Sequence, residues 1–197
     1  MKKLLSVFIV LMFAAPSFAL TGISFGIKGG MVTNFEQPGF TVPGEDGESM
    51  PLGGLQAKIS TIPFIDVIVS GEYAWKNETY DVFGYGFEVN RRDLLFSASA
   101  VYPVKFKVVS PYMGGGVATH SLGYDFTEPE GWALSTYDVV VPEDVTRLGY
   151  HLMGGADFQI PAFPLTLNAE IRMNWIDAPG GTAKYNSFTA GLLFGLP

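Results

Sequence analysis

A strictly alternating segment constrains the fold of this chain more than any other feature. In LTLNAEIRMNW, residues 165–175, every second side chain is apolar, and the intervening ones include Glu170 and Arg172. A period of two residues is that of a β-strand, in which successive side chains point to opposite faces of the sheet. The segment is therefore predicted to be a strand with one apolar face and one polar face. The question it raises is which of the two faces lies inside the protein.

The same alternation recurs along the chain, whereas helical periodicity is nearly absent. The sequence also holds 24 Gly and 13 Pro, which interrupt helices and mark turns. The run of three glycines at 114–116 leaves the facing of its own strand ambiguous. Eight strands are predicted, at residues 21–33, 54–61, 65–77, 89–102, 107–122, 148–160, 165–175 and 187–196.

The connections between these strands alternate between long and short. The short ones, TIPFID, PVKF and PAFP, each combine proline with an aromatic residue, and proline suits a turn or a strand end. The longer ones are residues 34–53, 78–88, 123–147 and 177–185. Short turns at one end and longer loops at the other are typical of a bacterial outer-membrane barrel. The predicted fold class is therefore all-β, an eight-stranded antiparallel transmembrane β-barrel. Ten strands remain an alternative if residues 133–141 form a hairpin.

The apolar face of the predicted strands carries almost no charge in its central stretch, and nine charged residues gather on the opposite face. Five are positive and four are negative, so this face is close to neutral, as a narrow polar lumen filled by paired side chains would be. The apolar face would then contact lipid. The residues predicted to form this structural charge network in the lumen are Lys28, Lys58, Glu72, Lys76, Arg91, Asp93, Asp157, Glu170 and Arg172.

Aromatic residues on the apolar face form two groups, one near each end of the strands. Tyr73, Trp75 and Trp175 lie toward the long loops, and Tyr102 and Phe158 lie beside the short turns. Two aromatic bands that flank an apolar belt are expected at the two membrane interfaces. A soluble, lipocalin-like barrel with the apolar face inward is the alternative. The short turns gathered at one end and the paired bands favour the membrane protein.

The first 19 residues have the features of a secretory signal peptide. Lys2 and Lys3 precede a short apolar run, and Ser17-Phe18-Ala19 is a small-x-small cleavage site. The predicted domains are a signal peptide over residues 1–19 and an outer-membrane barrel over residues 20–197. The absence of Cys excludes disulfides and lipidation of the bacterial lipoprotein kind. The net charge of −7 argues against a nucleic-acid partner.

No catalytic, cofactor-binding or metal-binding residue is predicted. His120 and Ser121 are adjacent, so on a strand they point to opposite faces and cannot form a dyad. His151 is interpreted as a structural lumen residue, and a zinc site is not expected from two His and no Cys. The segment PGEDGES, residues 43–49, is interpreted as a solvated acidic loop. The alternative is that divalent cations bridge it to lipopolysaccharide.

Two short segments carry a family resemblance. The final strand SFTAGLLFGLP alternates Phe188, Ala190, Leu192 and Phe194, and resembles the last-strand signal of outer-membrane barrels. PYMGGGVA, residues 111–118, is similar to a strand of small bacterial barrels of the OmpW, OmpX and OmpA-transmembrane-domain type. The resemblance implies a bacterial outer-membrane location, contact with membrane lipids and lipopolysaccharide, and recognition by the barrel-assembly machinery. We also expect a monomer.

The predicted function is that of a non-enzymatic outer-membrane protein with a side-chain-filled lumen. Such a barrel would support the cell envelope and present its acidic loops at the surface. The OmpW resemblance implies a different role, that of a narrow channel or conduit for small or hydrophobic solutes. A third possibility, an enzyme that modifies lipid A, lacks a paired nucleophile and base in this sequence.

Overall fold

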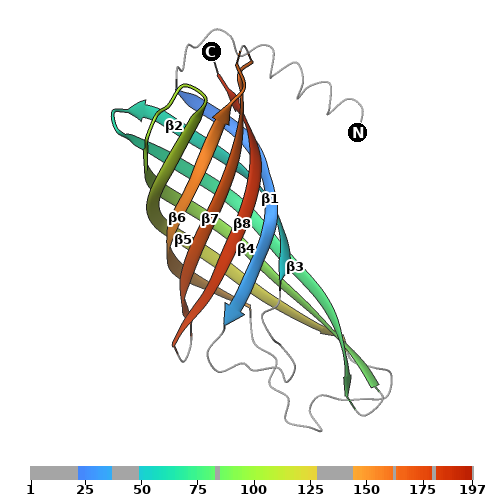
Figure 1. Ribbon diagram of the computed structural model, residues 1–197. Helices are drawn as coiled ribbons and strands as arrows, with labels where there is room; N and C mark the ends of the chain where they lie inside the picture. Colours follow the sequence, from blue (N-terminus) through green and yellow to red (C-terminus); the bar gives the residue numbers. More distant parts are fainter. Residues whose placement is uncertain are drawn as a thin grey trace, which may run out of the picture.

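Eight antiparallel strands close into a barrel in the computed structural model of the chain (Figure 1). The structure describes residues 22–36, 49–82, 85–127, 144–161, 163–178 and 181–196. Each strand pairs with its neighbours in sequence, and β8 pairs with β1 to complete the ring. The predicted fold class is confirmed. The strands are β1 (Ile23–Glu36), β2 (Met50–Ile62), β3 (Ile65–Val82), β4 (Tyr85–Pro103), β5 (Val109–Thr127), β6 (Val145–Gln159), β7 (Leu165–Ala178) and β8 (Gly181–Gly195).

The apolar face of every strand points outward. Ile27 and Leu55, which are cross-strand partners on β1 and β2, are 61% and 66% exposed. On β7, Leu167 and Ile171 are exposed, whereas Glu170 and Arg172 between them are buried. This answers the question raised by the alternating segment, because its polar face lines the interior. A barrel with an apolar outer face and a polar interior is stable where lipid, rather than water, surrounds it. Among the described residues, no helix has the length and apolar character needed to cross a membrane.

Inward-facing glycines allow neighbouring strands to approach closely. A Cβ atom on Gly30 would lie 1.9 Å from the carbonyl oxygen of Phe188, and one on Gly114 would lie 2.1 Å from that of Ala100. Any larger residue at either position would force the two strands apart. Gly29, which faces outward, has room, because its nearest neighbour would be the Leu52 oxygen at 3.7 Å.

The two ends of the barrel differ in the length of their connections. At the turn end, residues 63–64, 104–108 and 160–164 join successive strands. At the loop end, the β3–β4 and β7–β8 hairpins extend further than the sequence pattern predicts. β3 and β4 stay paired as far as Val82 and Tyr85, although the pairing of β2 with β3 stops at Leu52 and Ala74. The β3–β4 hairpin therefore projects beyond the barrel wall, at the lower right of Figure 1.

Some predictions concern residues that the structure does not describe. The predicted signal peptide, the acidic stretch up to residue 48 and the segment 133–141 lie outside the described residues. The predicted loops at 78–88 and 177–185 consist mainly of paired strand residues instead. At 177–185 the alternation of polarity fades because the inward side chains are apolar as well: Ala183 and Tyr185 pack with Ile176 in a buried cluster. Backbone pairing continues without it.

Candidate functional site: a charged network in the lumen

The centre of the lumen holds two cations and two carboxylates in mutual contact. Lys28 comes from β1, Glu72 from β3, and Glu170 and Arg172 from β7, each at an inward-facing position. Arg172 lies 3.0 Å from Glu72 and 2.8 Å from Glu170, measured between nitrogen and oxygen. The Lys28 ammonium lies 2.7 Å from Glu72 and 3.4 Å from Glu170. These four side chains, called here the central network, are at most 2% exposed.

The central network spans the barrel rather than one side of it. β3 and β7 stand four strands apart in either direction around the ring, so the contact between Arg172 and Glu72 crosses the lumen. Equal numbers of positive and negative groups keep the cluster neutral. Buried ions are tolerated only when they are paired and hydrogen-bonded, and this arrangement supplies both.

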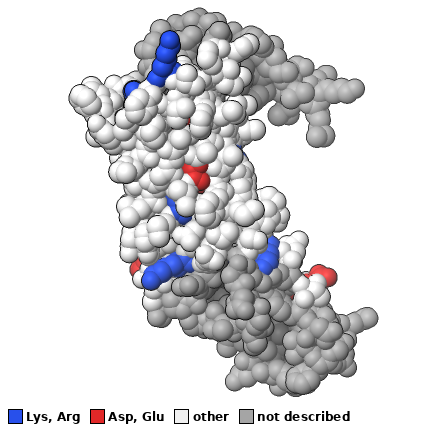
Figure 2. Space-filling model, in the orientation of Figure 1, with Lys and Arg blue, Asp and Glu red and all other residues white. Residues whose placement is uncertain are grey.

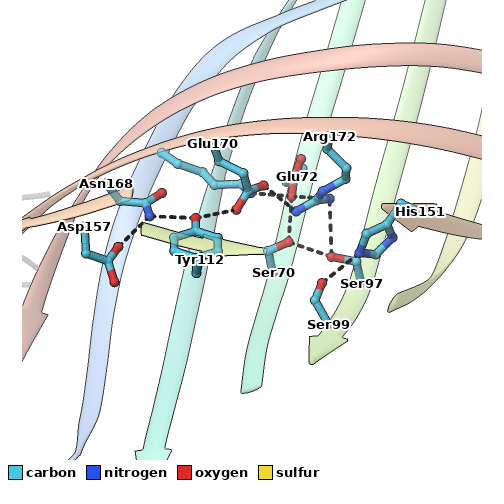
Figure 3. A network of polar contacts seen from close by, with 11 residues as sticks. Ser70, Glu72, Ser97, Ser99, Tyr112, His151, Asp157, Asn168, Glu170 and Arg172 are labelled. Carbon is cyan, nitrogen blue, oxygen red and sulfur yellow. Dashed lines mark hydrogen bonds and ion pairs between the residues drawn. The ribbon is translucent and has the colours of Figure 1, made fainter. Parts of the chain in front are cut away.

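Hydroxyl groups extend the central network toward β4 and β5 (Figure 3). Ser70 donates a hydrogen bond to Glu72 over 2.6 Å and lies 2.8 Å from the hydroxyl of Ser97. The Tyr112 hydroxyl donates to Glu170 over 3.3 Å. With these contacts, polar groups of β1, β3, β4, β5 and β7 meet inside the barrel.

A second group of polar side chains lies between the central network and the turn end. Lys58 contacts Asp157 and lies 3.2 Å from Asp66. Its ammonium also sits 4.7 Å from the centre of the Tyr112 ring. Asn168 donates to Asp157 over 2.8 Å and to the Tyr112 hydroxyl over 2.9 Å, which connects this group to the central network (Figure 3).

Two histidines face the lumen, and each lies within hydrogen-bond distance of a polar side chain. His120 Nδ1 lies 2.9 Å from Asp93, and the His120 ring packs edge-on against Tyr185. His151 Nε2 lies 2.7 Å from the hydroxyl of Ser99. No described residue hydrogen-bonds the other ring nitrogen of His151. Ser99 with His151 is therefore one pair, and His120 with Asp93 is a separate pair.

The predicted lumen residues can be placed individually. Six of them, Lys28, Lys58, Glu72, Asp157, Glu170 and Arg172, belong to the two groups above, and Asp93 pairs with His120. Lys76 and Arg91 are cross-strand partners nearer the loop end. His120 is 1% exposed and Ser121 points outward, so the two lie on opposite faces. The described residues contain no cluster of three or more His, Cys, Asp or Glu side chains suited to a metal ion.

Sequence reasoning missed Asp66, Tyr112 and Asn168. Asp66 lies where the turn TIPFID overlaps the predicted strand 65–77, and the signal that identifies it is that it shares the parity of Glu72 on that strand. Tyr112 was hidden by the ambiguous facing of the glycine-rich strand. Asn168 is uncharged and was passed over, although it connects the two polar groups.

Comparisons with known proteins agree with this architecture. A family model described as outer membrane protein beta-barrel domain matches residues 5–194. Neisserial surface protein A has a similar structure, with a TM-score of 0.56 and 14% identity over 89% of this chain and 97% of that one. No curated protein matches the sequence.

Two further solved structures are similar in fold. Ail, the attachment invasion locus protein of Yersinia pestis, solved with the heparin analogue sucrose octasulfate, gives a TM-score of 0.55 and 13% identity. The match covers 88% of this chain and 98% of that one. OprG, an outer membrane protein from Pseudomonas aeruginosa, gives 0.52 and 13%, over 89% and 94% of the two chains. At these identities the likeness is one of fold alone.

Proposed function

The chain belongs to the outer membrane protein β-barrel domain family, and we propose that it is a non-enzymatic barrel that acts through its outer surface. The observation that carries the proposal is the contact between Arg172 and Glu72 across the lumen. An eight-stranded barrel has an interior only wide enough for side chains to fill. A buried ion network in the middle of that interior leaves solutes no wide path.

The loop end supports a role in surface presentation. The β3–β4 hairpin extends well past the last rung that β2 shares with β3. At its base, Arg92 on β4 contacts Asp125 on β5 at 3.2 Å and Asp144, just before β6, at 3.1 Å. These contacts tie together the strands from which the long connections leave. The two longest connections also carry most of the acidic excess of the sequence.

The lumen chemistry supports the absence of enzymatic activity. Ser99 has a histidine partner, but no carboxylate among the described residues contacts the far side of that ring, and Asp93 contacts a different histidine. Nucleophilic catalysis needs nucleophile, base and orienting group in one chain of contacts. Both pairs are also buried inside the barrel, away from lipid and from the surface.

Recording in planar bilayers tests the closed lumen. We expect purified wild-type protein to show no stable conductance. The E72A/R172A variant removes one charge of each sign from the central network, leaves Lys28 facing Glu170, and is expected to conduct. Thr189→Ala, which removes one inward hydroxyl from β8, is the matched control and should behave as the wild type. A stable, large conductance of the wild type would falsify the proposal and favour the narrow channel.

The family membership supports an outer-membrane location, and the route there is part of the proposal. Residues 1–19 would be removed as a signal peptide, and the barrel-assembly machinery would recognise the last strand. The short turns would face the periplasm and the loop end would face lipopolysaccharide, with the barrel as a monomer. Mass measurement of the protein extracted from outer membranes checks the cleavage after Ala19. Protease access to the β3–β4 hairpin in intact cells checks the orientation.

A further inference from the structure

The three short turns share a feature that the closed lumen does not explain. Each exposes one phenylalanine: Phe64 is 75% exposed, Phe106 64% and Phe163 62%. Tyr102 and Phe158, on the adjoining strand ends, are also exposed. The apolar surface of the barrel wall therefore continues onto the turns themselves. We call Phe64, Phe106 and Phe163, together with Lys105 and Lys107, the turn-end collar.

The backbone at Phe64 adopts a costly conformation. Its φ angle is 67°, in the left-handed region that glycine enters freely and bulky residues rarely do. Most of the Phe64 side chain is exposed, so its contacts with other described residues contribute little to offset the cost of this conformation. The two-residue turn at 63–64 accounts for the angle, and the chain fills the position with an exposed aromatic side chain where Gly or Asn is usual.

The exposed charges of the described residues at the turn end are all positive. Lys105 and Lys107 flank Phe106 on the β4–β5 turn, and both are exposed. The nearby carboxylates, Asp66 and Asp157, point inward and are occupied by Lys58. Among the described residues of the three turns and their adjoining strand ends, no exposed carboxylate offsets these lysines. Figure 2 shows basic side chains reaching out at this end, at the top of the view, in a protein whose net charge is −7.

From these observations we propose that the turn-end collar binds anionic phospholipid. The three rings enter the boundary between headgroups and acyl chains, where aromatic side chains are favoured. Lys105 and Lys107 then contact headgroup phosphates, and the net negative charge of the lipid sets the preference. The inference rests on the proposed insertion in a membrane. It is independent of the closed lumen, so a conducting barrel would leave it standing.

Quenching by brominated lipids provides a local test. The three tryptophans, Trp75, Trp132 and Trp175, are replaced by Phe, and F106W places a reporter indole in the collar. The protein is folded into vesicles that contain dibrominated phosphatidylglycerol or dibrominated phosphatidylcholine in an unbrominated phosphatidylcholine background. Each lysine near an anionic surface strengthens attraction by about fivefold, so quenching should favour the anionic lipid by at least that factor. The preference should fall as NaCl is raised.

Three variants of the reporter protein separate the contributions. K105Q/K107Q should lose the anionic preference while both lipids still quench. K105R/K107R should keep it, because the charges remain. Lys184→Gln, an exposed cation near the loop end, is the matched control and should also keep it. A gel shift between unheated and boiled samples verifies that each variant is folded. Equal quenching by the two lipids before any lysine is changed would overturn the proposal, as would a preference that survives K105Q/K107Q.

Discussion

Arg172 and Glu72 meet 3.0 Å apart although they stand on β7 and β3, on opposite sides of the closed sheet. No neighbouring strand pair could make this contact, so it reports directly on the width of the lumen. It also makes the interior a cross-braced structure, because a side chain on one wall is held by the facing wall. Four predictions follow from this architecture and can be tested on the purified protein.

The first prediction compares two arginines that each contact two carboxylates, one pair inside the barrel and the other at its exposed loop end. Arg172 bridges two carboxylates at 1% exposure, and Arg92 bridges two at 43% exposure. Arg172→Met leaves buried carboxylates short of a cation and should lower the free energy of unfolding by about 3–5 kcal/mol. Arg92→Met should have much less effect, because water screens exposed ion pairs, and that effect should shrink further in high salt. Urea unfolding in lipid vesicles, followed by tryptophan fluorescence, measures both.

The contrast between the two variants is what matters here. If Arg172→Met were no more destabilising than Arg92→Met, burial would add nothing to the ion pairs. The central network could then not be regarded as a structural brace.

The second prediction uses two adjacent glycines. Gly30→Ala places a methyl group where the Phe188 oxygen already lies, so β1 and β8 must separate. Overpacking of this kind should cost about 1–3 kcal/mol or prevent folding. Gly29→Ala, whose new carbon would have its nearest neighbour at 3.7 Å, is the control and should fold normally. The fraction of each variant that shows the folded gel mobility gives the comparison. Equal yields would mean that the strands do not approach as closely as described.

The third prediction tests the outward apolar face. Ile27→Arg puts a charge on the outer wall among Leu55 and Leu192, its partners on β2 and β8. Near the middle of the bilayer this should destabilise the folded state by about 2–4 kcal/mol. Asn77→Arg, on the outer side of the projecting hairpin, should have almost no effect. Urea unfolding in vesicles distinguishes the two. A tolerated arginine at position 27 would place that residue in water.

The fourth prediction concerns the β3–β4 hairpin. Replacing residues 79–88 by Asn-Gly removes rungs that β3 and β4 share beyond the point where β2 leaves the sheet. A two-stranded ribbon on its own is marginally stable, so the barrel should lose no more than about 1 kcal/mol. The shortened protein should still migrate as a folded species before boiling. Failure to fold would show that the hairpin forms an essential part of the barrel.

Much of the fold could be predicted from the sequence because polarity and strand geometry share one period. Alternation identified eight strands and separated Glu170 and Arg172 from Leu167 and Ile171. It did not predict the strand ends. From Glu78 to Val82 the polarity no longer alternates along the sequence, yet the backbone stays paired with β4.

The candidate site was only partly predictable, for a related reason. Parity shows that Arg172 and Glu72 point inward, but not that they meet. Their contact depends on strand register and on the narrowness of the ring. Tyr112 was obscured because glycines at 114–116 carry no polarity to assign the faces of β5. Asp66 can be identified from the sequence, since it continues the parity of Glu72 to the beginning of β3.

The pairing of β1 with β8, from Ser24 opposite Gly195 to Glu36 opposite Lys184, forms a seam between the two ends of the sheet. A sheet of only seven paired strands would still have two edge strands. Hydrocarbon cannot form hydrogen bonds with the unpaired N–H and C=O groups of those edges. Pairing of β8 with both β7 and β1 therefore removes the last unpaired edges of the sheet. Anything that delays the arrival of β8 would leave an open ribbon, vulnerable to proteases and to mispairing with other chains.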